Sequence, residues 1–77
     1  MPKLPRVKAP RLIRVLEKAG FVLDRQKGSH QIFLDSTGRR VVVPVHAGKV
    51  LRPKTLKSIL RDARLSVAEF ARLLSDL

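Results

Sequence analysis

Apolar side chains recur at helical spacing in two segments of the chain, residues 10–19 and residues 53–63. Pro10 and Pro53 suit the first turns of these segments, and Gly20 suits the end of the first one. The two apolar stripes consist of Leu12, Ile13, Leu16 and Ala19, and of Leu56, Ile59, Leu60 and Ala63. The pattern therefore predicts two helices, each with one face turned toward a core.

A third helix is predicted over residues 66–77 by its start signals. Ser66 and Glu69 have the spacing of a capping box, and Leu65 and Phe70 have the spacing of a hydrophobic staple. Its apolar face consists of Val67, Phe70, Ala71 and Leu74.

Three short apolar runs between the first two helices, residues 21–25, 30–35 and 39–45, predict strands. The turn-prone residues 36–38 join the second and third runs into a hairpin. Pro44 has no N–H to donate to a ladder, so the third strand is expected at a sheet edge. The order predicts an α+β fold, α-β-β-β-α with an additional C-terminal helix, in which helices cover one side of a three-stranded antiparallel sheet.

The length of 77 residues predicts a single domain over residues 9–77, preceded by a loose basic arm over residues 1–8. The chain has no cysteine, which fits a reducing cytoplasm, and no apolar run long enough to span a bilayer. We therefore expect a cytoplasmic protein without a membrane partner.

Charge narrows the class of partner. Seventeen Lys and Arg against six Asp and Glu give a formal net charge of +11, which favours a polyanion, with nucleic acid before anionic membrane or a small acidic protein. A solvated basic surface without a partner is the alternative. The aromatic residues Phe21, Phe33 and Phe70 lie in apolar patterns, so we expect core side chains and no base-stacking platform.

Candidate chemistry centres on His30 and His46, the only two histidines. No acidic cluster or carboxylate pair accompanies them, so no metal ion or other cofactor is expected. RNA is cut without a metal when its 2′-hydroxyl attacks the adjacent phosphorus. That step needs a base, an acid and positive charge near the phosphate, which histidine and Lys or Arg supply. A structural histidine at a strand end is the alternative for His30.

The register of the predicted hairpin decides where His46 lies. If Asp35 faces Arg40, His30 and His46 start on opposite sides of the sheet, whereas if Asp35 faces Arg39 they share a side. Gly28 and Ser29 also have two interpretations: a tight turn into the strand, or a phosphate contact through backbone amides and the hydroxyl.

The remaining cations fall into two groups. Arg11, Arg14 and Lys18 lie on the polar side of the first helix, which is typical of ordinary solvation. The predicted RNA contacts are Lys27, Gly28, Ser29, His46, Lys49, Arg52, Lys54 and Lys57. Several of these surround the start of the second helix, where free amides and the helix dipole favour phosphate.

The stretches "KAGF", "GSHQIF" and "VPVHAGK…TLKSIL" occur in an order and spacing that resembles the HicA family of small toxin ribonucleases. The resemblance covers about Leu12 to Leu65. It implies a fold like the double-stranded RNA-binding domain and a metal-independent endoribonuclease that cleaves messenger RNA, with His30 of the "GSH" motif as the catalytic residue. It also implies a HicB-type antitoxin that masks the site, so that a free monomer becomes a hetero-oligomer.

Two features depart from the resemblance. Family members often have glycine just before "TL", where this chain has Lys54, which either alters the helix entry or adds a phosphate contact. The last helix, residues 66–77, extends past the matching region and either packs on the domain or helps dock the partner. A non-catalytic RNA-binding module is the alternative function. A DNA-binding helix-turn-helix is less favoured because Arg72 is the only basic residue of the last helix.

Overall fold

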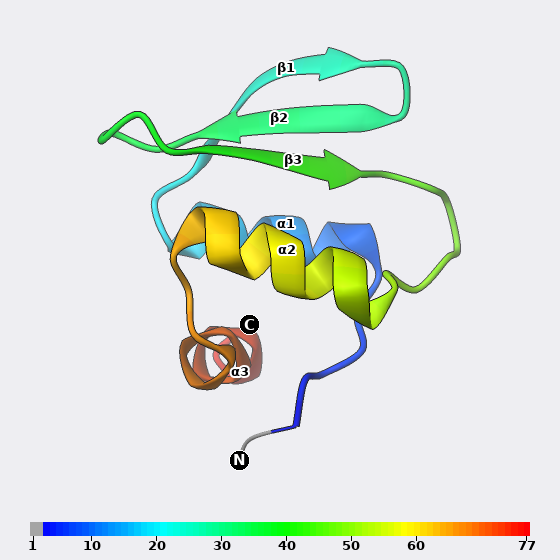
Figure 1. The fold of residues 1–77 in the computed structure, drawn as a ribbon, viewed down its shortest axis with the longest axis vertical. Coiled ribbons are helices and arrows are strands. Elements are labelled where there is room, and N and C mark those ends of the chain that lie inside the picture. The colour runs from blue at the N-terminus through cyan, green and yellow to red at the C-terminus, as the bar shows by residue number, and fades with distance from the viewer. Residues whose placement is uncertain (1–2) are drawn as a thin grey trace.

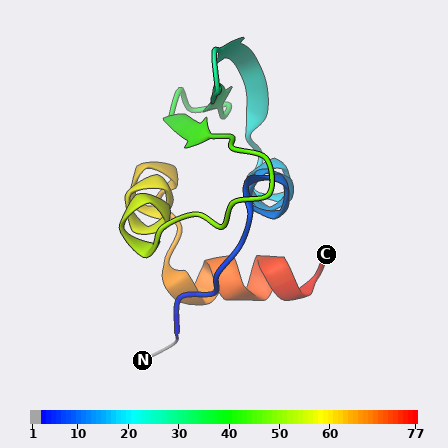
Figure 2. The same cartoon turned by 90° about the vertical axis from the view of Figure 1, so that its right-hand side faces the viewer.

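The computed structural model describes residues 3–77. Its three strands stand between a first helix and two later ones along the chain (Figure 1). The elements are α1 (Ala9–Lys18), β1 (Val22–Lys27), β2 (His30–Leu34), β3 (Arg40–Pro44), α2 (Pro53–Ala63) and α3 (Val67–Ser75). The strands form an antiparallel sheet in the order β1-β2-β3. Helices α1 and α2 lie side by side beneath the sheet, and α3 crosses below them (Figure 2). The expected α+β fold, similar to the double-stranded RNA-binding domain with an added helix, is confirmed.

Helix α1 ends in a Schellman motif, as Gly20 predicted. Gly20 has a φ of 98°, its N–H donates to the Glu17 carbonyl at 3.0 Å, and the Phe21 N–H donates to the Leu16 carbonyl at 2.9 Å. Phe21 is therefore part of the helix cap and is buried, so the prediction that it opens the first strand is wrong. The strand begins at Val22.

Strand β1 also runs two residues further than the expected 21–25, because the turn into β2 is tight. Lys27 pairs with His30, which leaves a two-residue loop. Gly28 has a φ of 61° and Ser29 does not have a positive φ, the pattern of a type II′ hairpin turn. Every residue of β1 is exposed, so this strand extends beyond the helices that cover β3.

The β2–β3 register places Leu34 opposite Arg40 and His30 opposite Pro44. Asp35 therefore stands opposite Arg39, and its N–H donates to the Arg39 carbonyl at 3.2 Å. Of the two registers considered, the structure adopts the one that gives His30 and His46 the same parity.

Pro44 occupies a position where a missing N–H costs the sheet nothing. The Val45 N–H donates to the Ser29 carbonyl at 2.7 Å, so His30 and Pro44 form the next, non-hydrogen-bonded pair of the ladder. The backbone nitrogen of Pro44 consequently faces away from β2. The expectation that the third strand lies at a sheet edge is confirmed.

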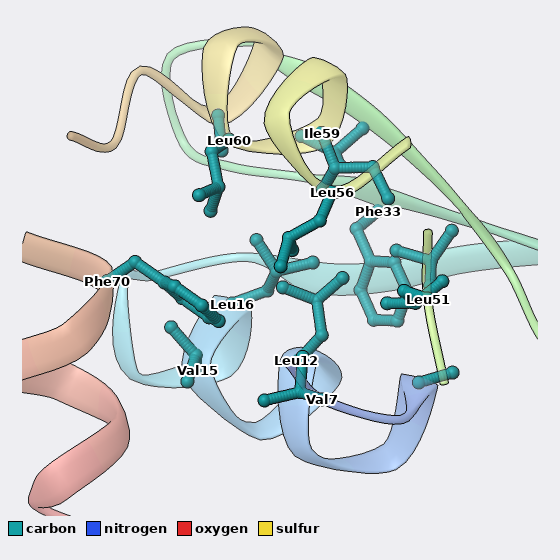
Figure 3. Packing of buried hydrophobic residues seen from close by; sticks show 14 of the residues in the cluster. Val7, Leu12, Val15, Leu16, Phe33, Leu51, Leu56, Ile59, Leu60 and Phe70 are labelled. Carbon is teal, nitrogen blue, oxygen red and sulfur yellow. The ribbon is translucent and has the colours of Figure 1, made fainter. Parts of the chain in front are cut away.

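The core lies between the lower face of the sheet and all three helices (Figure 3). Its fully buried side chains are Leu12, Val15 and Leu16 of α1, Phe33, Val41 and Val43 of the sheet, Leu56 of α2 and Phe70 of α3. All three phenylalanines are buried, as predicted. Because Phe70 is completely enclosed beside Val15 and Leu16, α3 packs on the domain as part of the core.

The start of α3 has the predicted capping box. The Glu69 N–H donates to the Ser66 hydroxyl, and the Ser66 N–H donates to a Glu69 carboxylate oxygen, both at 3.0 Å. The backbone and hydroxyl hydrogen bonds of Ser66 lower the pKa of Glu69. The helix is shorter than expected and ends at Ser75.

The segment before α1 packs against the domain over the part that the structure describes, residues 3–8. Val7 is buried, its carbonyl accepts from the Leu51 N–H at 2.9 Å, and Lys8 forms an antiparallel bridge with Val50. These residues differ from the loose arm that the sequence suggests, and residues 1–2 of that arm lie outside the described residues. No helix within residues 3–77 is long and apolar enough to cross a membrane.

Candidate active site

Three parts of the chain lie on the same side of the molecule, at the right of Figure 1. They are the β1–β2 turn and the end of β3 in the sheet, and the start of α2 in the helix layer below it (Figure 2). The antiparallel pairing explains this, because β2 starts where β1 and β3 end. This end carries both histidines and most of the predicted RNA contacts.

His30 is the first residue of β2 and is exposed. Its Cα partners are Lys27 in β1 and Pro44 in β3, so it occupies the middle of a three-residue row across the sheet. In the non-hydrogen-bonded pair with Pro44 the two side chains approach closely. The core side chains Phe33, Val41 and Val43 have the opposite parity, so His30 lies on the sheet face turned away from the helices.

A cavity of about 360 Å³ adjoins this row. Its wall consists of Pro44, His46, Lys49, Val50, Leu51, Arg52 and Thr55. The loop that forms most of this wall is held in two places: the Lys49 N–H donates to the His46 carbonyl at 3.1 Å, and the Leu51 N–H donates to Val7. Since Pro44 belongs to both the wall and the row, the cavity opens beside the cross-strand partner of His30.

The first turn of α2 closes the cavity and adds anion-binding groups. Arg52 is the N-cap residue, no side chain caps the helix, and no acidic residue lies in its first turn. The N–H groups of Lys54 and Thr55 are thus available at the positive end of the helix dipole. Lys54 leaves the helix entry regular, because the Leu56 N–H still donates to the Arg52 carbonyl at 2.9 Å.

The acidic residues of the chain lie away from this end of the sheet. Asp24, Asp35 and Asp62 form ion pairs with Arg25, Arg39 and Arg61, and Glu69 caps α3. None of the six acids lines the cavity. Within residues 3–77, none of Lys27, Lys49, Arg52, Lys54 and Lys57 belongs to an ion pair. The positive charge beside the histidines is therefore uncompensated, which favours a polyanion.

Asp35, in the turn between β2 and β3, has a structural role in this fold. One of its carboxylate oxygens accepts from the Thr37 N–H, the Thr37 hydroxyl and the Arg39 N–H at 2.7 to 3.0 Å. Desolvation raises the pKa of Asp35, but these hydrogen bonds and the Arg39 charge outweigh it, so the pKa lies below its ordinary value. Asp35 thus organises the β2–β3 turn.

The structure brings most of the predicted site residues together. Lys27, Gly28, Ser29 and His30 meet at the β1–β2 turn, and His46, Lys49 and Arg52 line the cavity. Lys54 and Lys57 lie exposed on α2 and do not line it. Thr55 was not among the site residues predicted from the sequence, although it lines the cavity. It could have been found as a hydroxyl residue in the first turn of a helix that no side chain caps. Within residues 3–77, no three His, Asp or Glu side chains gather as a metal site would require.

A family model described as the HicA toxin of bacterial toxin-antitoxin systems matches residues 9–65, from the start of α1 to just past α2. No curated protein matches the chain. The matched region contains the β1–β2 turn, both histidines and the whole cavity wall, and it excludes α3.

Proposed function

Because the chain belongs to the HicA family and is thus a toxin of a bacterial toxin–antitoxin system, we propose that it is an endoribonuclease that cleaves messenger RNA without a metal ion. The observation that carries the proposal is the placement of His30. Its side chain is exposed at the head of β2, in one row with Lys27 and Pro44, beside a cavity lined by cations.

The chemistry follows from what an exposed imidazole among cations does to RNA. Histidine exchanges a proton near neutral pH, so His30 acts either as the base for the 2′-hydroxyl or as the acid for the departing 5′ oxygen. Positive charge nearby stabilises the phosphorane-like transition state. DNA lacks the 2′-hydroxyl and is not a substrate by this route.

Binding of the RNA relies on charge rather than on stacking. The buried phenylalanines leave no exposed aromatic platform in residues 3–77. The proposed phosphate contacts are the amides of Gly28 and Ser29, the Ser29 hydroxyl, His46, and the side chains of Lys27, Lys49, Arg52, Lys54 and Lys57. Affinity dominated by such contacts falls steeply with salt.

We also propose a HicB-type antitoxin as the protein partner, which converts a free monomer into a hetero-oligomer in the cytoplasm. The net charge of +11 favours an acidic partner. Val50 is 47% exposed on the cavity wall, which gives such a partner an apolar contact beside the site. An antitoxin that covers this end of the sheet hides His30 from RNA.

The test is digestion of messenger RNA by the purified toxin and by His30→Ala, with Arg72→Ala on α3 as the control. We expect His30→Ala to lose roughly 10²- to 10⁴-fold in rate, the usual contribution of one acid–base group, while Arg72→Ala keeps the wild-type rate. Equal cleavage by wild type and His30→Ala would refute the assignment. Salt-sensitive binding that leaves the RNA intact would instead show a non-catalytic RNA-binding module.

A further inference from the structure

We propose that His46 is the second proton-transfer group of the same reaction, paired with His30 across the scissile phosphate, and that the adjoining cavity holds the RNA chain on one side of that phosphate. The inference rests on the proposed RNA cleavage by His30. It adds a second catalytic residue to His30, the one that the GSH motif indicates.

The sheet register supplies the first step of the argument. His30 stands directly opposite Pro44, and His46 follows Pro44 by two positions. The Val45 N–H bond to Ser29 shows that the ladder continues to the residue just before His46. His46 itself lies in the loop, two residues past the end of β3. The two histidines therefore lie at the same end of the sheet, His30 at the start of β2 and His46 just beyond β3.

The cavity supplies the second step, because it is lined by His46 and by Pro44, the cross-strand partner of His30. Pro44 and His46 line the same wall, so the cavity beside His46 begins at the close partner of His30. Its volume of about 360 Å³ lies within the usual range of small-molecule sites, and Lys49, Arg52 and Thr55 offer groups that bind phosphate. A ribose-phosphate seated there has its neighbouring phosphate between the two side chains.

The third step is elimination among the groups that can transfer a proton. RNA cleavage needs one group to take a proton and one to give it. Lysine and arginine as residue types are cations, which suits the stabilisation of negative charge on the phosphate. No acidic residue lines the cavity, and the chain has only two histidines. His46 is exposed, so its ring is open to a bound RNA.

The two histidines account for both proton transfers of the cleavage step. One neutral imidazole takes the proton of the 2′-hydroxyl as the O2′–P bond forms, and the other, as imidazolium, gives its proton to the 5′ oxygen as the P–O5′ bond breaks. The products are a 2′,3′-cyclic phosphate and a 5′-hydroxyl. The two rings end with exchanged protonation states, which proton exchange with water restores. Each ring needs to reach its oxygen at about 2.6–3.2 Å from opposite sides of one phosphate.

The experiment compares wild type, His30→Ala, His46→Ala, His46→Gln and the control Arg72→Ala on an RNA oligonucleotide cleaved at one mapped bond. Both His46 substitutions are expected to lower kcat by roughly 10²- to 10⁴-fold with little change in KM, and to remove one limb of the bell-shaped pH–rate profile. Unfolding midpoints equal to wild type show that the exposed substitution leaves the fold intact.

A second substrate assigns the two roles. It carries sulfur in place of the bridging 5′ oxygen at the mapped bond, so its leaving group needs no proton. The variant that lacks the acid recovers most of its rate on this substrate, and the variant that lacks the base does not. We expect the cleavage rate to recover on this substrate in only one of the two variants, His30→Ala or His46→Ala.

The following results overturn the inference. Cleavage by the His46 variants within about threefold of wild type overturns it while the proposed function stands, as does a loss confined to KM. Recovery of both variants, or of neither, on the sulfur-containing RNA excludes a pair with divided roles. Absence of cleavage by the wild-type protein removes the proposed function and this inference together.

Discussion

Replacing Lys49 and Arg52 together with alanine tests whether the cavity wall binds RNA phosphates. The change is made in a His30→Ala background, in which the proposed chemistry is disabled and the RNA stays intact during titration. Both side chains are exposed on the cavity wall and form no ion pair within residues 3–77, so their loss removes charge without breaking a contact that stabilises the fold.

The expected magnitude follows from the number of cations at the site. Each phosphate neutralised on a single strand makes the slope of log affinity against log salt more negative by about 0.7. The five Lys and Arg side chains of the proposed site therefore predict a slope of about −3.5 for the parent, and the three that remain in the variant predict about −2.1. Between about 50 and 200 mM salt, affinity then falls roughly 130-fold for the parent and roughly 20-fold for the variant.

The assay is fluorescence anisotropy of a labelled RNA over a series of salt concentrations. The control is Arg61→Ala with Arg72→Ala, which removes the same charge from the last turn of α2 and from α3. A slope that changes as much in this control as in the cavity variant would show binding spread over the whole basic surface. An unchanged slope in the cavity variant would show that the RNA lies elsewhere.

Three further predictions concern stability. Phe70→Ala should lower the free energy of unfolding by about 3–5 kcal/mol in urea titrations, because it empties a fully buried site; a loss under about 1 kcal/mol would mean that α3 is not part of the core. Arg64→Gly should raise it by about 1 kcal/mol, because Arg64 holds a φ of 57° after α2; lower stability would contradict a strained cap. Asp35→Asn removes a carboxylate whose pKa is depressed on folding. Its stabilisation is present above the unfolded pKa and lost as pH falls through the folded pKa, so the wild type should lose its advantage below about pH 3.8; a pH-independent difference would contradict this.

The helices could be predicted from the sequence because their signals are local. Gly20 marks a stop that the Schellman hydrogen bonds confirm, and Ser66 with Glu69 marks a start that the capping box confirms. The buried stripe of α2 is the one that the periodicity indicated. In α1 the prediction is right for Leu12 and Leu16, but it missed the fully buried Val15, and Ile13 and Ala19 are only partly buried. Phe21 was misassigned because an apolar residue after a glycine fits a strand start and a helix cap equally well.

The arrangement of the candidate site could not be predicted in full from the sequence, because it depends on contacts between residues that are far apart in the chain. The hairpin register comes from the way Asp35 folds the turn around Thr37 and Arg39. The apolar run of β3 is continuous and does not alternate with polar residues, so the sequence of the strand allows either register. The cavity is formed by a loop, a helix start and a strand end, so its volume and the part played by Thr55 appear only in three dimensions. Charge and the GSH motif pointed to this end of the sheet, and the packing of the chain decides which side chains share it.

The bridge between Lys8 and Val50 bears on when the toxin becomes competent during its synthesis. A nascent chain that has exposed only α1 and the first hairpin already carries His30, but it lacks the loop and helix start that form the neighbouring wall. Closure needs residues from opposite halves of the polypeptide to meet, which makes it a late, non-local event in folding. A ribosome that stalls before residue 50 therefore holds a fragment in which the cavity beside the histidines has not been assembled.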